Sequence, residues 1–306
     1  YKMKDLYIAA GISKQAIYKY RLRQEYISSV SKEVIKVCNK IRKNHKRMSC
    51  RKMYSRVKNT MQVGRDNFEQ IGFSNGFKLQ IVRNKHRTTW ATKLAIFDNH
   101  LEGKVFNGLN QALQSDIFYF DVAGKSYYGV CIIDVYSRRL LALHVSKTLR
   151  AEQNVVALRK AIKARNGLTF KGCIFHSDRG TQYISQLQIA LIKELEMTPS
   201  MCKLPQENAY AERVQGTIKY EYLNPEMITE ENIQRKIMQI LWLYNNERPH
   251  SSLGNRTPVE YEQYISSLDE KDRPQMTVYK WSHPLLTEMP VANKKEKRSK
   301  KEKSQH

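Results

Sequence analysis

The chain has 306 residues, of which 41% are hydrophobic, enough for about two or three compact units with real cores. Its formal net charge is +24, of which +17 falls in residues 1–100 and +7 in residues 101–306. This charge predicts a polyanionic partner, nucleic acid ahead of a membrane surface. No stretch approaches the roughly 18 consecutive apolar residues of a membrane span, and no signal peptide is evident. The five scattered cysteines form no C-x-x-C pair, which argues against a zinc site and a disulfide framework and favours a reducing cytoplasm.

The first segment, residues 1–28, has the outline of a helix-turn-helix. Residues 4–24 read as two helices, with Gly11 in the turn and Ser13 as the N-cap of the second helix. One polar face of that helix carries the candidate DNA contacts Lys14, Gln15, Tyr18 and Lys19. An ordinary helical hairpin is the alternative.

Residues 29–75 form a second predicted helical unit, because apolar residues recur at helical spacing through three short segments. Bases far outnumber acids between Arg42 and Lys58, which favours phosphate contacts over a merely solvated face. The candidate DNA contacts here are Arg42, Lys43, Lys46, Arg47, Arg51 and Lys52. Residues 76–110 read as a basic connector, with a patch at 83–87.

From about residue 111 the hydrophobic period changes to that of strands. Three β-rich segments separated by short turns predict an antiparallel meander, and they lie near 115–121, 126–134 and 138–146. An amphipathic helix ends at Gly167, and then come a short apolar strand at 173–177 and further helices. The predicted fold is a mixed α/β layer over residues 111–265, with the sheet covered by helices.

Three carboxylates fall on separate elements of this predicted domain. Asp116 lies on the first strand, Asp178 at the end of the fourth and Glu212 on a later helix. If the fourth strand lies beside the first, the two aspartates are neighbours. Two Mg²⁺ ions held by such oxygens clamp the attacking and leaving oxygens of a phosphoryl transfer. Position alone does not establish a metal site, because many strands of such chains carry aspartates.

The residues that flank these acids carry a more specific signal. Five blocks occur in order: SDIFYF, IIDVYSRRLLAL, HSDRGTQY, ENAYAERVQGTIKYE and YNNERPHSSLGNRTPVEY. Together they resemble the transposases of the third insertion-sequence family (OrfB type), over roughly residues 29–265. The resemblance implies a multidomain protein in which all-α helix-turn-helix units precede an α/β ribonuclease H-like (integrase catalytic core) domain with a mixed sheet. It places the family's D-D-E triad on Asp116, Asp178 and Glu212.

Some positions compete with this assignment or depart from the family pattern. Asp134 matches a recurrent family position, but we interpret it as support for the turn into Arg138; Asp121 has no family counterpart. Glu207 stands where the family usually has an aspartate, and it is a minor rival of Glu212. Phe118 stands where a threonine is usual, which bears on local packing.

Further residues receive roles from the resemblance. Lys219 falls on the same side of its helix as Glu212 and is expected to grip the DNA end, with a surface lysine as the alternative. For Arg179, phosphate contact and structural pairing remain open, whereas Arg248 and His250 are able to touch DNA. The supporting residues are Asp134, Arg138, His176 and Asn208. Residues 266–306 are expected to end in a disordered basic tail.

The sequence thus predicts a DNA transposase that cuts a transposon strand and joins the freed 3′-hydroxyl to target DNA. The family implies two Mg²⁺ (or Mn²⁺) ions, double-stranded DNA (terminal repeats and target), a homo-oligomer on DNA, an upstream-frame protein or fusion, and a bacterial cytoplasm near the nucleoid. The alternatives are an inactive or domesticated DNA-binding relative and a nuclease that cuts without joining. A retroviral-type integrase is disfavoured, because no His/Cys zinc module precedes the core.

Overall fold

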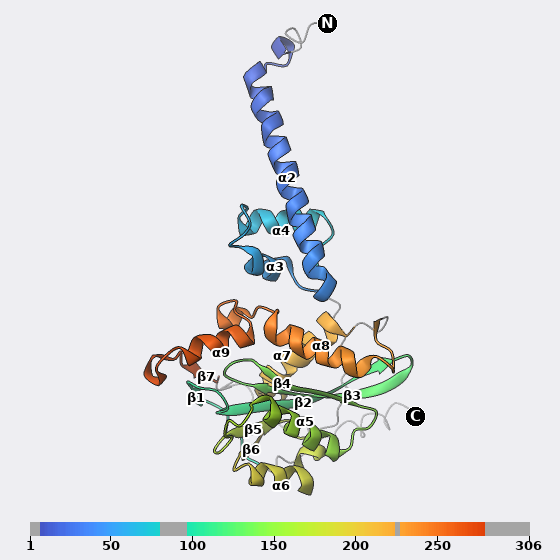
Figure 1. The fold of residues 1–306 in the computed structure, drawn as a ribbon, viewed down its shortest axis with the longest axis vertical. Helices are drawn as coiled ribbons and strands as arrows, with labels where there is room; N and C mark the ends of the chain where they lie inside the picture. The colour runs from blue at the N-terminus through green and yellow to red at the C-terminus, as the bar shows by residue number, and fades with distance from the viewer. Residues whose placement is uncertain (1–6, 80–96, 224–226, 279–306) are drawn as a thin grey trace, which may run out of the picture.

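A computed structural model describes residues 7–79, 97–223 and 227–278. It consists of a helical N-terminal unit, at the top of the picture, and an α/β core below it (Figure 1). The predicted patch at 83–87 and the basic tail beyond residue 278 lie outside the described residues. Among the described helices, none combines the length and apolar character that crossing a membrane requires.

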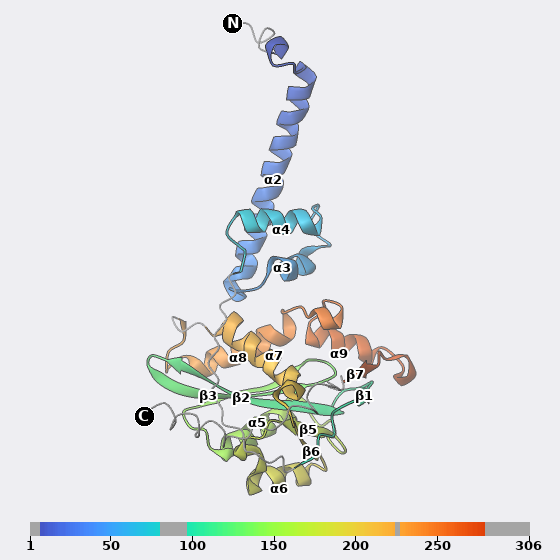
Figure 2. The same ribbon diagram turned by 180° about the vertical axis from the view of Figure 1, so that it is seen from behind.

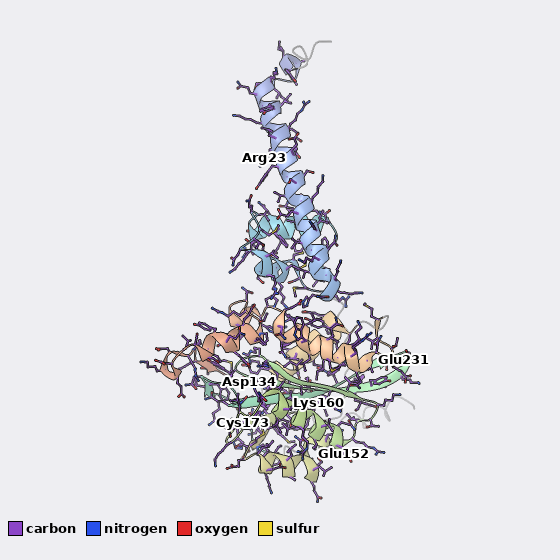
Figure 3. The ribbon with its side chains drawn as sticks, in the orientation of Figure 1. Arg23, Asp134, Glu152, Lys160, Cys173 and Glu231 are labelled. Atoms are coloured by element: carbon purple, nitrogen blue, oxygen red, sulfur yellow. The ribbon has the colours of Figure 1, made fainter. Side chains whose placement is uncertain are left out.

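The N-terminal region is dominated by one long helix, α2 (Lys14–Asn44). The predicted cap and turn are confirmed: the Ala16 N–H donates to Ser13 Oγ at 3.1 Å, and Gly11 has a φ of +65° in the turn before it. The predicted boundary between residues 28 and 29 is wrong, because α2 contains no glycine or proline and continues through it. Its first half projects beyond the other helices, where Arg23 extends from it (Figures 2 and 3).

The second half of α2 packs with two short helices, α3 (Cys50–Val57) and α4 (Arg65–Ser74). Their shared core is made of the buried side chains Val34, Cys38, Met48, Cys50, Met53, Met61 and Phe68. The three predicted helical segments therefore form one unit with a core of its own.

The meander is confirmed as β2 (Ala112–Val122), β3 (Lys125–Asp134) and β4 (Leu140–Ser146), paired antiparallel in that order. A two-residue turn joins β2 to β3, and both of its residues, Ala123 and Gly124, have positive φ. That geometry matches the right-handed twist of the flanking strands.

The fourth predicted strand, β5 (Ile174–Ser177), pairs with β2, the arrangement on which the neighbouring aspartates depend, and the pairing is parallel. The order of the sheet is β4-β3-β2-β5-β6, with β6 (Thr198–Met201) at the edge. The sequence did not predict β6, because it contains Pro199, which a strand tolerates at a sheet edge. A small second sheet pairs β1 (Val105–Phe106) with β7 (Met276–Thr277), so that parts of the predicted connector and C-terminal segment join the core.

Helices cover both faces of the main sheet (Figure 1). One apolar cluster packs α5 (Ala151–Ala164) and α6 (Gln186–Glu194) against one face. A second packs α7 (Ala209–Thr217) and α8 (Ile233–Asn246) against the other. The remaining helical segments are α9 (Pro258–Ser266), the π-helical turn η3 (Ile218–Tyr222) and the 3₁₀ turns η1 (Thr181–Ile184), η2 (Pro205–Asn208), η5 (Ser251–Leu253) and η6 (Glu270–Asp272).

Candidate active site

The register of β2 and β5 brings Asp116 and Asp178 to neighbouring positions. Gln114 pairs with His176 and Ser115 with Ser177, so the next residue of β2 is Asp116 and the first residue after β5 is Asp178. Paired residues of parallel strands direct their side chains to the same face, and residues two apart share a face. Both carboxylates therefore belong to the face that α7 covers.

Glu212 approaches from α7, and Gln114 holds that helix in place. The Gln114 Oε1 accepts from the backbone N–H groups of Tyr210 and Ala211, each at 3.1 Å. Its Nε2 donates to the Glu207 carbonyl at 3.0 Å. These bonds satisfy helix-terminal groups and fix the first turn of α7 on β2, two residues before Asp116. Sequence reasoning missed Gln114; the only signal was an amide within the apolar strand ALQSDIF.

Besides burial, the negative charges within the group of three acids raise the pKa values of Asp116 and Glu212. Burial raises the pKa of Asp116 well above its usual value, and the charges of Asp178 and Glu212 raise it further. Burial and Asp178 likewise raise the pKa of Glu212, and burial raises that of Asp178, whose Oδ1 accepts from the Gly180 N–H at 3.0 Å. No ion pair with a base compensates these carboxylates within the ranges described. Such a cluster favours a bound cation.

Lys219 follows α7 on η3, and its ammonium lies over the ring of Tyr119, 4.9 Å from the ring centre. Burial lowers its pKa, which the charge of Asp116 opposes, so the two groups are within electrostatic reach. The three carboxylates offer only oxygen donors, a set that suits Mg²⁺ or Mn²⁺. As they stand, no three acidic, histidine or cysteine side chains of the described ranges converge closely enough to enclose an ion. Glu212 has an exposed side chain, and in this conformation it does not complete a metal-binding set with the two aspartates.

The predicted supporting residues hold the scaffold around the acids. His176 is buried, its Nδ1 lies 2.9 Å from Ser200 Oγ, and burial lowers its pKa to about 4, so the ring is neutral at pH 7. The Asn208 amide donates to the Ser115 carbonyl at 3.1 Å, next to Asp116. Arg138 lies 3.9 Å over the ring of Tyr210 on α7.

The rival acids are engaged elsewhere. Asp134 accepts from the N–H groups of Tyr136 and Ser137 and pairs with Arg165 at 2.8 Å, which confirms its role in the turn. Asp121 accepts from Ser126 Oγ at the hairpin. Glu207 accepts from the N–H groups before η2, at Lys203 and Leu204, as a local cap.

The candidate DNA contacts divide into exposed and engaged groups. The exposed ones are Lys14, Gln15, Tyr18, Lys19, Lys43, Lys46, Arg47 and Arg51. Arg51 pairs with Glu69 at 3.1 Å within the helical unit. Arg42 donates to the carbonyls of Lys46 and Phe77, and it therefore closes the end of α2.

Other candidates contact the protein itself, and their DNA contacts stay predictions. Arg248 is buried and binds both oxygens of Glu221, at 2.7 and 2.8 Å, and Lys52 reaches Glu221 at 3.5 Å. His250 packs against Tyr244. Arg179 donates to the carbonyls of Cys202 and Lys203, which favours its structural alternative. Glu221, which anchors two of these bases, had no signal in the sequence.

Known families match this core. The integrase core domain matches residues 107–204, and a second profile of the integrase core domain matches residues 195–258. Among solved structures, the integrase catalytic core of HTLV-2, determined with magnesium, is 19% identical, covers 54% of this chain and 99% of that chain, and has a TM-score of 0.42.

Curated relatives are bacterial transposases. The transposase of insertion sequence element IS629 from Shigella sonnei is 25% identical over 236 residues, 75% of this chain and 78% of that protein. Transposase InsF of IS3A from Escherichia coli is 29% identical, over 55% of this chain and 60% of that protein. The IS904 transposase of Lactococcus lactis is 26% identical, over 51% and 63%. The chain therefore carries an integrase core domain behind a helical N-terminal region, and it is similar in sequence to bacterial insertion-sequence transposases.

Proposed function

We propose that this DNA transposase cleaves and joins DNA strands with Asp116, Asp178 and Glu212 as its acidic triad. The observation that carries the proposal is the β2–β5 register, which aligns the two aspartates beneath the α7 turn that Gln114 holds. The repulsion among three acids without a compensating ion pair supports a cation-binding role.

Two Mg²⁺ or Mn²⁺ ions at this triad would activate the attacking hydroxyl and stabilise the leaving oxygen of a phosphodiester. The chain's own residues orient the site: Gln114 and Asn208 fix the α7 end against β2, and Lys219 offers a cation for a strand phosphate beside Asp116. His176 is neutral and buried, so it acts in the scaffold and not as a base.

The proposed substrate is double-stranded DNA, at the element's terminal repeats and at the target, and the proposed working state is a homo-oligomer on DNA. The chain spans 78% of the Shigella relative and 58% of a Mycobacterium tuberculosis relative. Partnership or fusion with an upstream-frame product is also a proposal, which rests on the resemblance. A DNA-binding relative that acts only by occupancy is the second candidate; the intact acids count against it.

The test is a strand-transfer assay with a labelled, pre-cut element end, a plasmid target and Mg²⁺ or Mn²⁺. We expect wild type to join the DNA, and Asp116→Asn, Asp178→Asn and Glu212→Gln each to lose at least about a hundredfold in rate, as for loss of a main electrostatic element of a site. Glu207→Gln is the matched control and keeps activity. Full activity in Asp178→Asn, or turnover that a chelator leaves unchanged, contradicts the proposal; binding without joining by wild type favours the occupancy candidate.

A further inference from the structure

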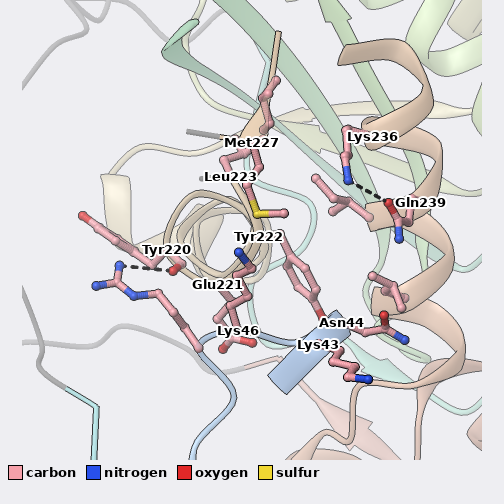
Figure 4. A pocket seen from close by; sticks show the side chains of 14 residues that line it. Lys43, Asn44, Lys46, Tyr220, Glu221, Tyr222, Leu223, Met227, Lys236 and Gln239 are labelled. Carbon is pink, nitrogen blue, oxygen red and sulfur yellow. Dashed lines mark hydrogen bonds between the residues drawn. The ribbon is translucent and has the colours of Figure 1, made fainter. Parts of the chain in front are cut away.

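A cleft of about 390 Å³ opens where the end of α2 meets η3 and α8 (Figure 4). Its walls come from both units, with Lys46 and Arg47 from the turn after α2, Tyr220 from η3 and Lys236 from α8. The volume falls within the range of about 300–1,000 Å³ of pockets that hold a small molecule. It can therefore receive a group the size of one nucleotide but not a duplex.

The cleft is strongly cationic. Four bases line it, Lys43, Lys46, Arg47 and Lys236, and none of them forms an ion pair with an acid in the described chain. Arg47 donates only to the Tyr220 carbonyl, at 3.4 Å, and Lys236 to Gln239 Oε1, also at 3.4 Å. Among the described residues of the lining, Glu221 is the single acid, and Arg248 and Lys52 already neutralise it. This balance of charge suits an anion.

The cleft also offers an aromatic platform. The side chain of Tyr220 is 47% exposed although it sits in the cleft wall, and Met227 on the same wall is 40% exposed. A basic groove with an exposed aromatic ring is the combination that binds unpaired nucleic acid strands, since every base has a face that can stack. A base inside a duplex is already stacked on both sides and cannot use such a ring.

The cleft adjoins the proposed active site along the chain. Tyr220 follows directly after Lys219, whose pKa is lowered by burial, against the raising effect of the charge of Asp116. The two residues lie on the π-helical turn η3, a kind of turn that is frequent at functional sites.

We propose that this cleft binds an unpaired segment of the DNA strand next to the reacting end, with its phosphates on Lys46, Arg47 and Lys236 and one base against Tyr220. The inference rests on the proposed function, because it deepens the account of how that site takes its DNA. It names the conformation of the substrate, a locally unpaired strand, which the triad alone does not.

The test measures binding by the full chain without divalent ions, so that no chemistry takes place. The probes are a blunt duplex and the same duplex with a single-stranded overhang whose first unpaired base is 2-aminopurine. We expect the overhang DNA to bind more tightly and its fluorescence to be quenched on binding. Tyr220→Leu is expected to weaken overhang binding about tenfold and to abolish the quenching, whereas Tyr220→Phe retains both.

A second experiment tests the basic residues of the cleft. Lys46→Ala/Lys236→Ala is expected to weaken overhang binding more than blunt binding and to lower its salt dependence by about 0.7 per lost phosphate contact. The control Lys163→Ala/Lys193→Ala removes two lysines of α5 and α6, on the opposite face of the sheet, and leaves the preference for the overhang unchanged. Equal binding of the two DNAs by wild type, or quenching that survives Tyr220→Leu, overturns the inference while the proposed function stands. Failure to bind either DNA overturns both.

Discussion

Phe118 and Gly129 form a matched pair across β2 and β3. They are direct partners in the register, and the buried Phe118 ring lies on the glycine. A Cβ at position 129 would stand 2.4 Å from Phe118 Cζ. An aromatic ring that covers a cross-strand glycine is a known way to stabilise a sheet. The phenylalanine in place of the family's usual threonine is thus accommodated by its partner.

Gly129→Ala is therefore expected to destabilise the core by about 1–3 kcal/mol, because the Phe118 ring must leave its place in a packed cluster. The measurement is the melting temperature and the denaturant midpoint followed by circular dichroism. Gly216→Ala on α7 is the control, since a Cβ there meets nothing within 4 Å and alanine favours a helix. A Gly129→Ala protein as stable as wild type would contradict the packing argument.

At the same scale, the sequence predicted the acids of the proposed triad but not the residues that position them. Asp116, Asp178 and Glu212 stand within motifs that resemble those of a known family, and the structure brings them to one face of the sheet. Gln114 and Glu221 act through residues that are distant in the chain. Gln114 binds the backbone of Ala211, and Glu221 pairs with Lys52. A pattern of neighbouring residues does not encode such partners.

Among the elements, those with a clear period were predictable and those without one were not. The strands of the meander are predicted by the alternation of apolar and polar residues, and α5 by apolar residues at helical spacing. Strand β6 has only four residues and a proline, and its place comes from pairing with β5. The length of α2 was missed for another reason: its exposed first half and its packed second half have different compositions, although the backbone continues through both.

The turn η3 joins three parts of the molecule through Glu221. Its carboxylate binds the buried Arg248 with both oxygens and reaches Lys52 of the helical unit. These partners lower the pKa of Glu221 below its ordinary value of 4.5, against the effect of burial. A lowered pKa in the folded state means that the pair stabilises the fold above the ordinary pKa and that this contribution is lost as pH falls through the folded-state value.

Glu221→Gln is expected to destabilise the core by about 3 kcal/mol at pH 7, because Arg248 would remain buried without a countercharge. The difference in melting temperature from wild type should be full at neutral pH and shrink as pH falls from about 4.5, where Glu221 of the unfolded chain becomes protonated, to the lower pKa of the folded state. Glu230→Gln is the control: its pairs with Lys125 and Lys147 are at the surface, where such pairs contribute little. A difference independent of pH would contradict the ionic account.

On the scale of the whole molecule, the helical unit touches the core through a few polar contacts. His45 lies 3.0 Å from Tyr222 Oη and 2.9 Å from Glu247, and Lys52 meets Glu221 at 3.5 Å. The apolar cores of the two units are separate clusters. Burial lowers the pKa of His45, so its ring is mainly neutral at pH 7 and the contact is a hydrogen bond more than an ion pair.

Because each unit keeps its own core, loosening these contacts should free the units without unfolding them. We expect His45→Ala/Lys52→Ala to raise the radius of gyration in small-angle scattering while far-ultraviolet circular dichroism stays unchanged. Arg51→Ala/Arg65→Ala is the control, since its ion pairs, to Glu69 and Asp66, lie inside the helical unit.

The orientation of the helical unit also matters for chemistry, because the residues it holds follow Lys219 directly on η3. A loosened unit should therefore still bind DNA, through the exposed bases of α2, but join strands more slowly as η3 loses its anchor. If the radius of gyration of His45→Ala/Lys52→Ala rises but the joining rate stays unchanged, the core positions Lys219 without help from the helical unit. A reduced rate with an unchanged radius of gyration would place the effect within the site and not in the docking of the two units.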